Sequence, residues 1–340
     1  MSFRVRPARN EDFQAIYEMA KLTGGGFTNL PADKGALVEK LSRSESAFAA
    51  DSAEPENDLF VMVLENAETG QIRGTCQMFS RVGSEWPFYS YRISTLTQTS
   101  KELGKIFRNE TLTLCTDFDG CSEVGGLFLH PGERAGGLGM LLARSRYLFI
   151  RLHRRRFAAR VLAELRGVID EAGASPFWDA IAGRFFGMSF QEADRFNAMH
   201  GTQFIADLMP KTPIYIAMLP ASARAVIGVP HPSGRAAMRM LEREGFAHDN
   251  YVDIFDGGPT MAAHTDDIRT VRDAREVEVA EIAEAPAGAT AELLGSGRLK
   301  NFAACYGRVA TREDGRVVLD AATASMLGAK AGDTILAVPR

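Results

Sequence analysis

A strand, a glycine-rich turn and a helix follow one another directly in the middle of this 340-residue chain. The apolar residues 127–129 are followed by a turn in which Arg134 opens the pattern Arg-x-x-Gly-x-Gly, and an amphipathic helix is predicted over 139–155. The first N–H groups of such a helix have no partner within it and lie at the positive end of its dipole. The pattern therefore predicts an anion-binding turn, and a pyrophosphate suits it.

Details of the turn separate it from other phosphate loops. Gly136, Gly137 and Gly139 let the backbone approach an anion closely, and Arg134 adds a fixed positive charge. A dinucleotide-binding loop would need Gly-x-Gly-x-x-Gly and an acid about 20 residues later, whereas the helix here is rich in arginine. No Gly-Lys-Ser/Thr follows, which argues against a nucleotide P-loop.

The N-terminal half alternates between strand and helix patterns. Strands are expected over 3–8, 59–65, 72–82, 111–116, 124–129 and 158–165, and helices over 11–22, 33–44 and 139–155. The turn at 66–71 contains the glycine expected of a hairpin. The order β-α-α-β-β-β-β-α-β predicts an α/β (α+β) fold with a mixed sheet and flanking helices, not a doubly wound one.

The second half is less regular. Residues 175–190 and 237–246 each contain a predicted helix that ends in a glycine turn before an apolar residue. This leaves both an internal duplication, a second related half, and coincidence open. Residues 283–292, rich in Ala and Glu, are interpreted as a linker, and the last 40 residues as a small β-rich tail.

Composition excludes several classes. The net charge of −4 argues against a nucleic-acid binder. The four cysteines form no Cys-x-x-Cys pair and no zinc-ligand spacing with histidine, so we expect reduced thiols and no metal. No run of 18 apolar residues and no signal peptide is found, which predicts a cytoplasmic protein without a membrane span. The arginines between 144 and 160 are interpreted as a solvated helix face that also contributes to phosphate binding, with a nucleic-acid or membrane patch as the alternative.

Two resemblances follow from these motifs. The Arg-x-x-Gly-x-Gly turn after a strand resembles the acyl-CoA pyrophosphate loop of the GNAT superfamily of N-acyltransferases, as residues 6–13 resemble a GNAT opening. Longer runs resemble the arginine N-succinyltransferase family over most of the chain. These runs are 23–28, 68–70, 88–92, 122–123, 127–129, 163–171, 175–178, 208–211, 213–215 and 251–260.

The resemblance implies a GNAT-like fold and a reaction in which succinyl-CoA and L-arginine give N2-succinylarginine and CoA. It implies that Leu127, with Leu129 in the same strand, binds succinyl-CoA, and that His231 is the proton donor. Residues 1–195 would form the acyl-CoA-binding domain, 196–275 a second α/β lobe that completes the active site, and 276–340 the linker and β-rich region.

Departures from the family pattern leave alternatives open. Gln98 stands where a histidine is expected, Val229-Pro230 precedes His231, and Gly125-Gly126 replaces a bulkier pair, which predicts a wider acyl slot. The alternatives are an ornithine or mixed arginine/ornithine succinyltransferase subunit, and a non-catalytic CoA-binding subunit. Both a homo-oligomer and a hetero-oligomer remain open.

Proton transfer and substrate binding need further groups. His231 is the first candidate for proton transfer because an unperturbed histidine titrates near neutral pH, and Glu123 is the second candidate, as a carboxylate base. A bound arginine needs carboxylates for its guanidinium and a cation for its carboxylate. Residues available for this, without an assignment, are Glu164, Asp253, Asp256 and Arg92.

Overall fold

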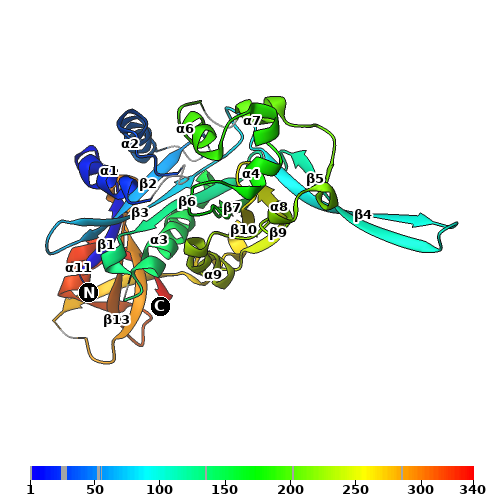
Figure 1. Cartoon of the computed structure of the whole chain (residues 1–340). Coiled ribbons are helices and arrows are strands. Elements are labelled where there is room, and N and C mark those ends of the chain that lie inside the picture. The colour runs from blue at the N-terminus through cyan, green and yellow to red at the C-terminus, as the bar shows by residue number, and fades with distance from the viewer. Residues whose placement is uncertain are drawn as a thin grey trace.

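A single twisted sheet runs through the whole chain (Figure 1). The computed structural model describes residues 2–23, 29–51, 54, 56–134, 136–200, 203–284 and 286–340, so residues 24–28 of the quoted family run lie outside the described part. Within that part the strand order is β12-β15-β11-β14-β13-β1-β2-β3-β6-β7-β10-β9-β4-β5-β8. The predicted mixed α/β class is confirmed, because strands in both directions alternate along the chain with helices.

The elements before residue 275 carry most of the predicted features. The strands are β1 (Phe3–Pro7), β2 (Leu59–Asn66), β3 (Ile72–Phe79), β4 (Ser90–Ser100), β5 (Lys105–Cys115), β6 (Ser122–Leu129), β7 (Arg160–Glu164), β8 (Ile214–Tyr215), β9 (Ala247–Asp253) and β10 (Pro259–His264). The helices are α1 (Phe13–Lys21), α2 (Lys34–Ala49), α3 (Leu138–Leu152), α4 (Pro176–Ala180), α5 (Gly183–Phe186), α6 (Phe190–His200), α7 (Gln203–Leu208), α8 (Ala221–Arg224), α9 (Arg235–Arg243) and α10 (Arg269–Asp273).

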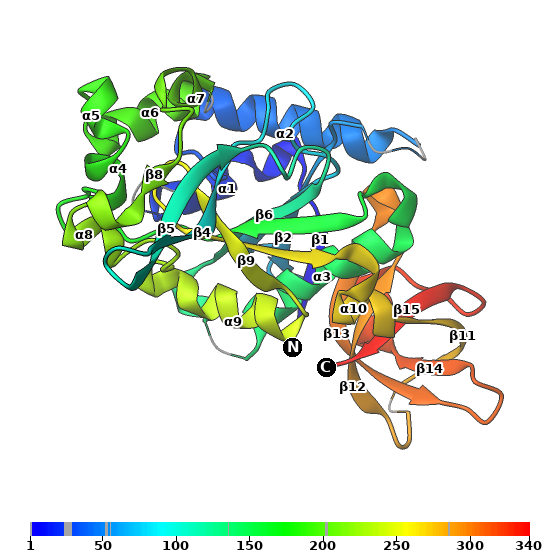
Figure 2. The same ribbon diagram turned by 90° about the vertical axis from the view of Figure 1, so that its right-hand side faces the viewer.

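Strand β2 shows why this sheet is covered on both faces. Its residues 59–65 are all buried, and they alternate between two apolar cores. Phe60 and Met62 face the core that contains the buried side of α3, whereas Val61 and Val63 face the core of α1 and α2. Helix α3 therefore lies on one side of these strands, and α1 and α2 lie on the other (Figure 2).

Strands β6 and β7 are parallel neighbours that separate early. Helix α3 connects them, as a crossover between parallel strands requires. Their pairing comprises only Ser122 with Val161 and Glu123 with Leu162, although β6 continues to Leu129. Past Glu123, one edge of β6 thus has no strand beside it among the residues that the structure describes.

The hairpin of β4 and β5 forms a long arm that leaves the body of the protein (Figure 1). The sequence reading missed β4 and the first six residues of β5, so the predicted strand count before α3 was one too low. These residues pack against little, and large apolar side chains remain exposed on the arm. They are Leu96, Leu103, Ile106 and Phe107, between 42% and 68% exposed.

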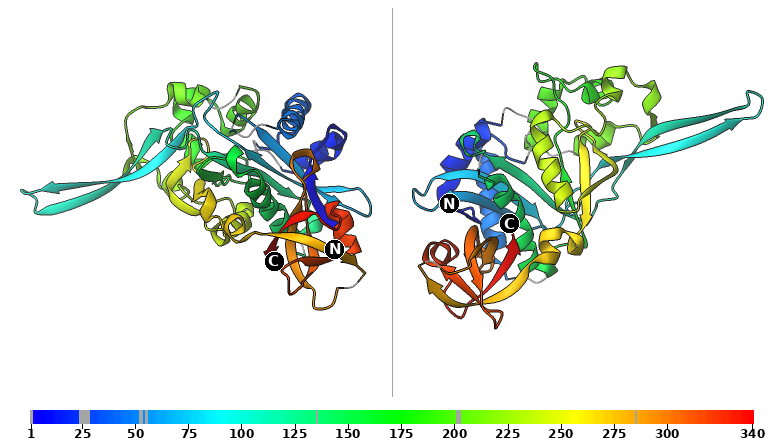
Figure 3. Two further views of the ribbon diagram at one scale, coloured as in Figure 1. Left: turned by 180° about the vertical axis from the view of Figure 1, so that it is seen from behind. Right: turned by 90° about the horizontal axis from the view of Figure 1, so that it is seen from below.

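The C-terminal region is a β-rich unit at the opposite end of the molecule from the arm (Figure 3). Its elements are β11 (Arg275–Ala283), β12 (Thr290–Ser296), β13 (Ala303–Thr311), β14 (Val317–Asp320), α11 (Ala321–Leu327) and β15 (Thr334–Pro339). The β-rich tail is confirmed, and the predicted linker falls largely in the connection between β11 and β12. Strand β13 pairs with β1, which joins this unit to the main sheet.

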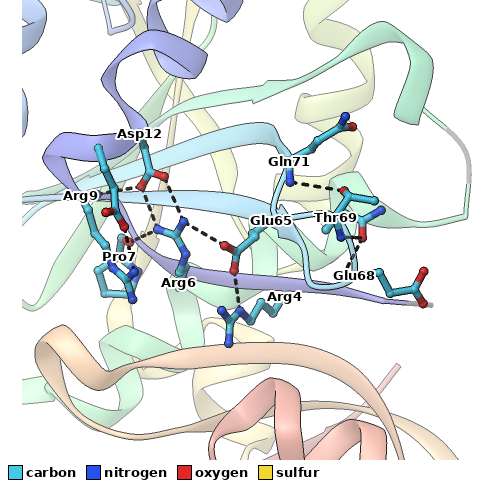
Figure 4. A network of polar contacts seen from close by, with 11 residues as sticks. Arg4, Arg6, Pro7, Arg9, Asp12, Glu65, Glu68, Thr69 and Gln71 are labelled. Atoms are coloured by element: carbon cyan, nitrogen blue, oxygen red, sulfur yellow. Dashed lines mark hydrogen bonds and ion pairs between the residues drawn. The ribbon is translucent and has the colours of Figure 1, made fainter.

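A buried guanidinium ties β1 to its surroundings (Figure 4). Arg6 is 6% exposed and donates to both carboxylate oxygens of Asp12, at 2.8 and 3.0 Å, and to Glu65 at 3.1 Å. Arg4 donates to the other oxygen of Glu65 at 2.6 Å. The network fixes the chain between β1 and α1, since a buried charge is tolerated only when it is paired.

Three of the arginines after the glycine turn are not part of a solvated face, which corrects the sequence interpretation for them, whereas Arg151 and Arg155 are exposed. Arg144, Arg146 and Arg156 are buried. Arg144 pairs with Glu244 at 3.2 Å, and Arg156 pairs with Asp58 at 2.9 Å. A periodicity argument does not reveal this, because the acids that neutralise these arginines come from distant parts of the chain.

Between β7 and β9 the chain is mainly helical. Helices α4 to α9 are interrupted by the two-residue strand β8. Gly187 and Gly245 follow helices with positive φ, as the two predicted glycine turns require. The two segments otherwise differ in their elements, so an internal duplication stays a hypothesis that the element order does not favour.

Candidate active site

Two side-chain contacts and two glycines with positive φ define the conformation of the glycine-rich turn. The His130 ring accepts a hydrogen bond from the Gly132 N–H at 3.2 Å, and Arg73 pairs with Glu133 at 3.0 Å. Gly136 and Gly137 take φ values of 71° and 82°, a region that disfavours other residues. These contacts and backbone angles define the shape of the described part of the turn.

The start of α3 carries free hydrogen-bond donors. Gly137 occupies the N-cap position, and no side chain caps the first turn among the described residues. Arg134 is exposed beside it, and Gly139 lies in the first turn itself. These groups fit a pyrophosphate, because uncapped N–H groups and a nearby guanidinium supply donors and positive charge together.

The C-terminal residue also reaches this turn. Arg340 donates to the carbonyl oxygen of Gly136 at 2.9 Å, and its guanidinium lies 4.5 Å from the centre of the Tyr306 ring. The β-rich C-terminal region therefore contributes to the shape of the predicted phosphate site. No local pattern predicts this contact, since the two residues are 204 positions apart.

Leu127 and Leu129 lie on the part of β6 that has left β7. Both are partly buried and pack against the core around α3. The adjoining Gly126 has φ 56°, and the pairing with β3 shifts by one residue there. The free edge of β6 and the turn at Gly137 thus belong to one continuous segment that runs from the gap between the strands to the start of α3.

Glu123 lies where β6 and β7 begin to separate. Its side chain is 6% exposed and accepts a hydrogen bond from Asn29 at 3.3 Å. Burial raises the pKa of Glu123 to about 7, although Asn29 and Lys40 act against the rise. A carboxylate with a pKa near working pH is suited to accept and return a proton.

Three side chains that the sequence reading missed surround Glu123. Gln77 donates to the Asn29 amide oxygen at 2.6 Å, and Lys40 donates to the Asn29 carbonyl at 2.6 Å. Burial lowers the pKa of Lys40 to about 7, and the nearby Glu123 moderates that change. No motif could have identified these residues, because only the packing of α2 and β3 around β6 brings them together.

The glycine pair before Leu127 makes room for these side chains. A Cβ at Gly125 would lie 2.7 Å from Asn29 Nδ2, and a Cβ at Gly126 would lie 2.8 Å from Gln77. The predicted widening of the acyl slot therefore finds no support, since Asn29 and Gln77 take the space beside both glycines.

The run at 251–260 builds a tight turn from its own acids. Asp253 accepts from the N–H groups of Phe255 and Asp256, at 2.7 and 2.8 Å. Asp256 accepts from the N–H groups of Gly167 and Gly258, at 2.7 and 2.8 Å. These carboxylates thus have structural partners, and burial raises the pKa of Asp256 to about 8.

His231 lies beside the segment of chain that follows β7. Its N–H donates to the Arg166 carbonyl at 2.8 Å, and Pro230 forms a bridge with Gly167. Nδ1 contacts Ser233 Oγ at 2.7 Å. Partial burial lowers the pKa of His231, and the charge of Arg166 adds to this effect.

Glu123 and His231 are not in contact. Glu123 pairs with Leu162, whereas His231 is attached at Arg166, four residues on. Extended chain rises about 3.3 Å per residue, so the two attachment points lie roughly 13 Å apart, with Glu164 between them.

Two further residues named from the sequence lie elsewhere. Gln98 lies exposed on the arm, and Arg92 pairs with Asp117 at 3.1 Å.

The described residues contain neither a metal-ligand cluster nor a membrane-spanning helix. No group of three or more His, Cys, Asp or Glu side chains in the described ranges is placed to hold a metal ion. In the same part of the chain, no helix is long and apolar enough to cross a bilayer. The four cysteines are free.

Comparisons with known proteins agree along the whole chain. Residues 3–270 match the family model described as arginine N-succinyltransferase beta subunit, and residues 275–339 match the one described as its C-terminal domain. Arginine N-succinyltransferases from Salmonella paratyphi B and Salmonella typhimurium are 42% identical over 331 residues, which is 97% of this chain and 96% of each relative.

A solved structure extends the similarity to three dimensions. It is that of arginine/ornithine succinyltransferase subunit AI from Pseudomonas aeruginosa, with a TM-score of 0.91 and 32% identity over 99% of this chain and 98% of that one. The family suggested by the short runs is therefore confirmed. The chain belongs to the arginine N-succinyltransferase family of acyltransferases.

Proposed function

We propose that this protein transfers the succinyl group of succinyl-CoA to the α-amine of L-arginine, as the first step of arginine breakdown in the cytoplasm. The observation that carries the proposal is the 42% identity to arginine N-succinyltransferases over 97% of the chain. The turn at the start of α3 supports it, because its uncapped donors fit the pyrophosphate of a CoA thioester.

We assign the acyl-CoA contacts to one segment. Arg134, Gly136, Gly137 and Gly139 hold the pyrophosphate, and Leu127 and Leu129 border the thioester. The free edge of β6 supports this, because backbone N–H groups there are able to polarise the thioester carbonyl. Holding the amine beside that carbonyl supplies a further part of the rate enhancement.

Protons move through two separate groups in this proposal. The amine nitrogen bonds to the carbonyl carbon, the carbon–sulfur bond breaks, and the amine loses a proton as the CoA thiolate gains one. Glu123 accepts the amine proton, and its raised pKa supports this role. His231 returns a proton to the thiolate. The roughly 13 Å between their attachment points favours separate tasks over a shared proton.

A second candidate function has its own support. The similar Pseudomonas aeruginosa chain is named an arginine/ornithine succinyltransferase subunit, and this name supports ornithine as a second amine and a hetero-oligomer as the assembly. A non-catalytic CoA-binding subunit is the remaining alternative.

We also propose that the chain is divided into residues 1–195, 196–275 and 276–340, and that the active site lies between the first two of these parts.

Thiol release tests these alternatives. The purified protein is incubated with succinyl-CoA and either L-arginine or L-ornithine, beside a His231→Ala variant. Release with arginine that falls at least about a hundredfold in the variant supports the proposal. Thiol release with ornithine alone would keep the succinyl transfer and assign ornithine, not arginine, as the amine substrate. Tight CoA binding without release from either amine refutes a standalone enzyme.

A further inference from the structure

One face of the main sheet gathers polar side chains from neighbouring strands. Residues that pair across strands share a face, as do alternate residues of one strand. Glu123 on β6 pairs with Leu162 on β7, and Glu164 lies two residues further along β7. Glu164 in turn pairs with Thr260 on β10. Glu123, Glu164 and Thr260 therefore point to the same side.

The same face continues onto β9 and β4. Tyr251 packs with Leu162 in one small apolar cluster, so Asp253, two residues on from Tyr251, faces the side of Glu164. Ser90 on β4 pairs with Asp253. Three carboxylates and two hydroxyls thus lie over adjoining strands.

Several of these groups lack a protein partner. Glu164 Oε1, Ser90 Oγ and Thr260 Oγ1 are buried, and none has a hydrogen-bond partner among the described residues. Ser90 and Thr260 are both 0% exposed. Buried polar atoms are normally paired, so three orphans on one face indicate a surface built for a ligand. The Glu164 side chain as a whole is partly exposed, so a ligand has access to it.

The charge of this face specifies the ligand. Burial raises the pKa of Glu164 well above its usual range, and Asp253, Glu123 and Asp256 add to the rise. Asp253 and Asp256 are committed to backbone N–H groups, which leaves Glu164 as the carboxylate with a free oxygen. A bound cation would offset this accumulation of acids.

We propose that Glu164, with the neighbouring Thr260, binds the cationic side-chain group of the amino acid substrate, a planar guanidinium in the first place. The assignment rests on the proposed succinyl transfer. A guanidinium carries five N–H donors and no acceptor, which matches a carboxylate and a neighbouring hydroxyl that are able to accept. Glu164 lies about 7 Å along β7 from Leu162, the neighbour of Glu123. That separation is comparable to the length of an extended arginine side chain, so the α-amine would reach Glu123.

The test compares L-arginine with L-citrulline, its neutral analogue of similar shape, in a Glu164→Gln variant. Binding of each amino acid is measured by titration calorimetry, and kcat/KM by thiol release with succinyl-CoA. We expect the arginine Kd and KM to rise about a hundredfold, with kcat changed much less, while the Kd and KM for citrulline stay within threefold.

A second variant tests the hydroxyl. Thr260→Val should weaken arginine binding about threefold to tenfold without lowering the melting temperature, since the hydroxyl has no described partner. The control is Glu276→Gln, an exposed carboxylate on β11.

The outcomes separate the two proposals. Arginine binding that depends on Glu164, without turnover, would support this site and refute the proposed reaction. Turnover of arginine with an unchanged KM in Glu164→Gln would keep the reaction and overturn the site. An equal loss for arginine and citrulline would also overturn it, because it would mean a general effect on the fold.

Discussion

Replacing Glu123 by glutamine should make the protein more stable and far less active. The substitution keeps the shape of the side chain and an oxygen that is able to accept from Asn29. It removes the negative charge that burial disfavours. Activity and stability should therefore move in opposite directions, which a simple packing defect would not produce.

The magnitude follows from the pKa of this carboxyl. Folding raises the pKa of Glu123 from 4.5 to about 7, which corresponds to about 3 kcal/mol of penalty on the charged form. The unfolded chain loses this proton near pH 4.5 and the folded protein near pH 7, so the penalty is absent at low pH and complete above pH 7. Lys40 loses its nearest anion in the variant, which offsets part of the gain. We expect a net stabilisation of about 1–3 kcal/mol at pH 8 and close to none at pH 4.

Two measurements test this reasoning. Urea unfolding at pH 4 and pH 8 gives the free energy of unfolding, and the pH profile of kcat/KM gives the role in proton transfer. The wild-type profile should rise through pH 7, and the variant should lose that rise together with about 10²–10⁴-fold in rate. An unchanged rate would refute the base assignment. A variant destabilised at pH 8 would refute the cost assigned to the buried charge.

The other predictions concern three separate parts of the molecule. Asp12→Asn leaves the buried Arg6 with Glu65 as its remaining acidic partner and should lower the free energy of unfolding by about 2–4 kcal/mol, measured in urea. Arg134→Ala should raise the KM for succinyl-CoA about tenfold with kcat unchanged, since the exposed guanidinium contributes to binding alone. Joining residue 95 to residue 110, its partner across the hairpin, by an Asn-Gly turn should change the free energy of unfolding by less than about 1 kcal/mol, because the removed tip packs against little. A large loss there would show that the arm supports the monomer.

Sequence patterns predicted those features that depend on neighbouring residues. The glycine turn, the helix after it and the strands that form buried apolar runs all have local signals, and the structure confirms these elements. The arm was missed because its strands are polar and exposed, with little of the alternation that marks a buried face. Its register comes from pairing between its own strands along their full length, as Ser90 with Cys115 shows at its base.

The chain by itself also determined its family, because long runs of residue types identify it without any contacts. Only the tertiary structure decided which charges meet. It paired Arg144 with Glu244, and it set Lys40 close to Glu123 while leaving Glu164 among acids. These relations join residues as many as a hundred positions apart. Burial and the distance between charges fix the pKa of a carboxyl, and both arise only when the strands are packed side by side.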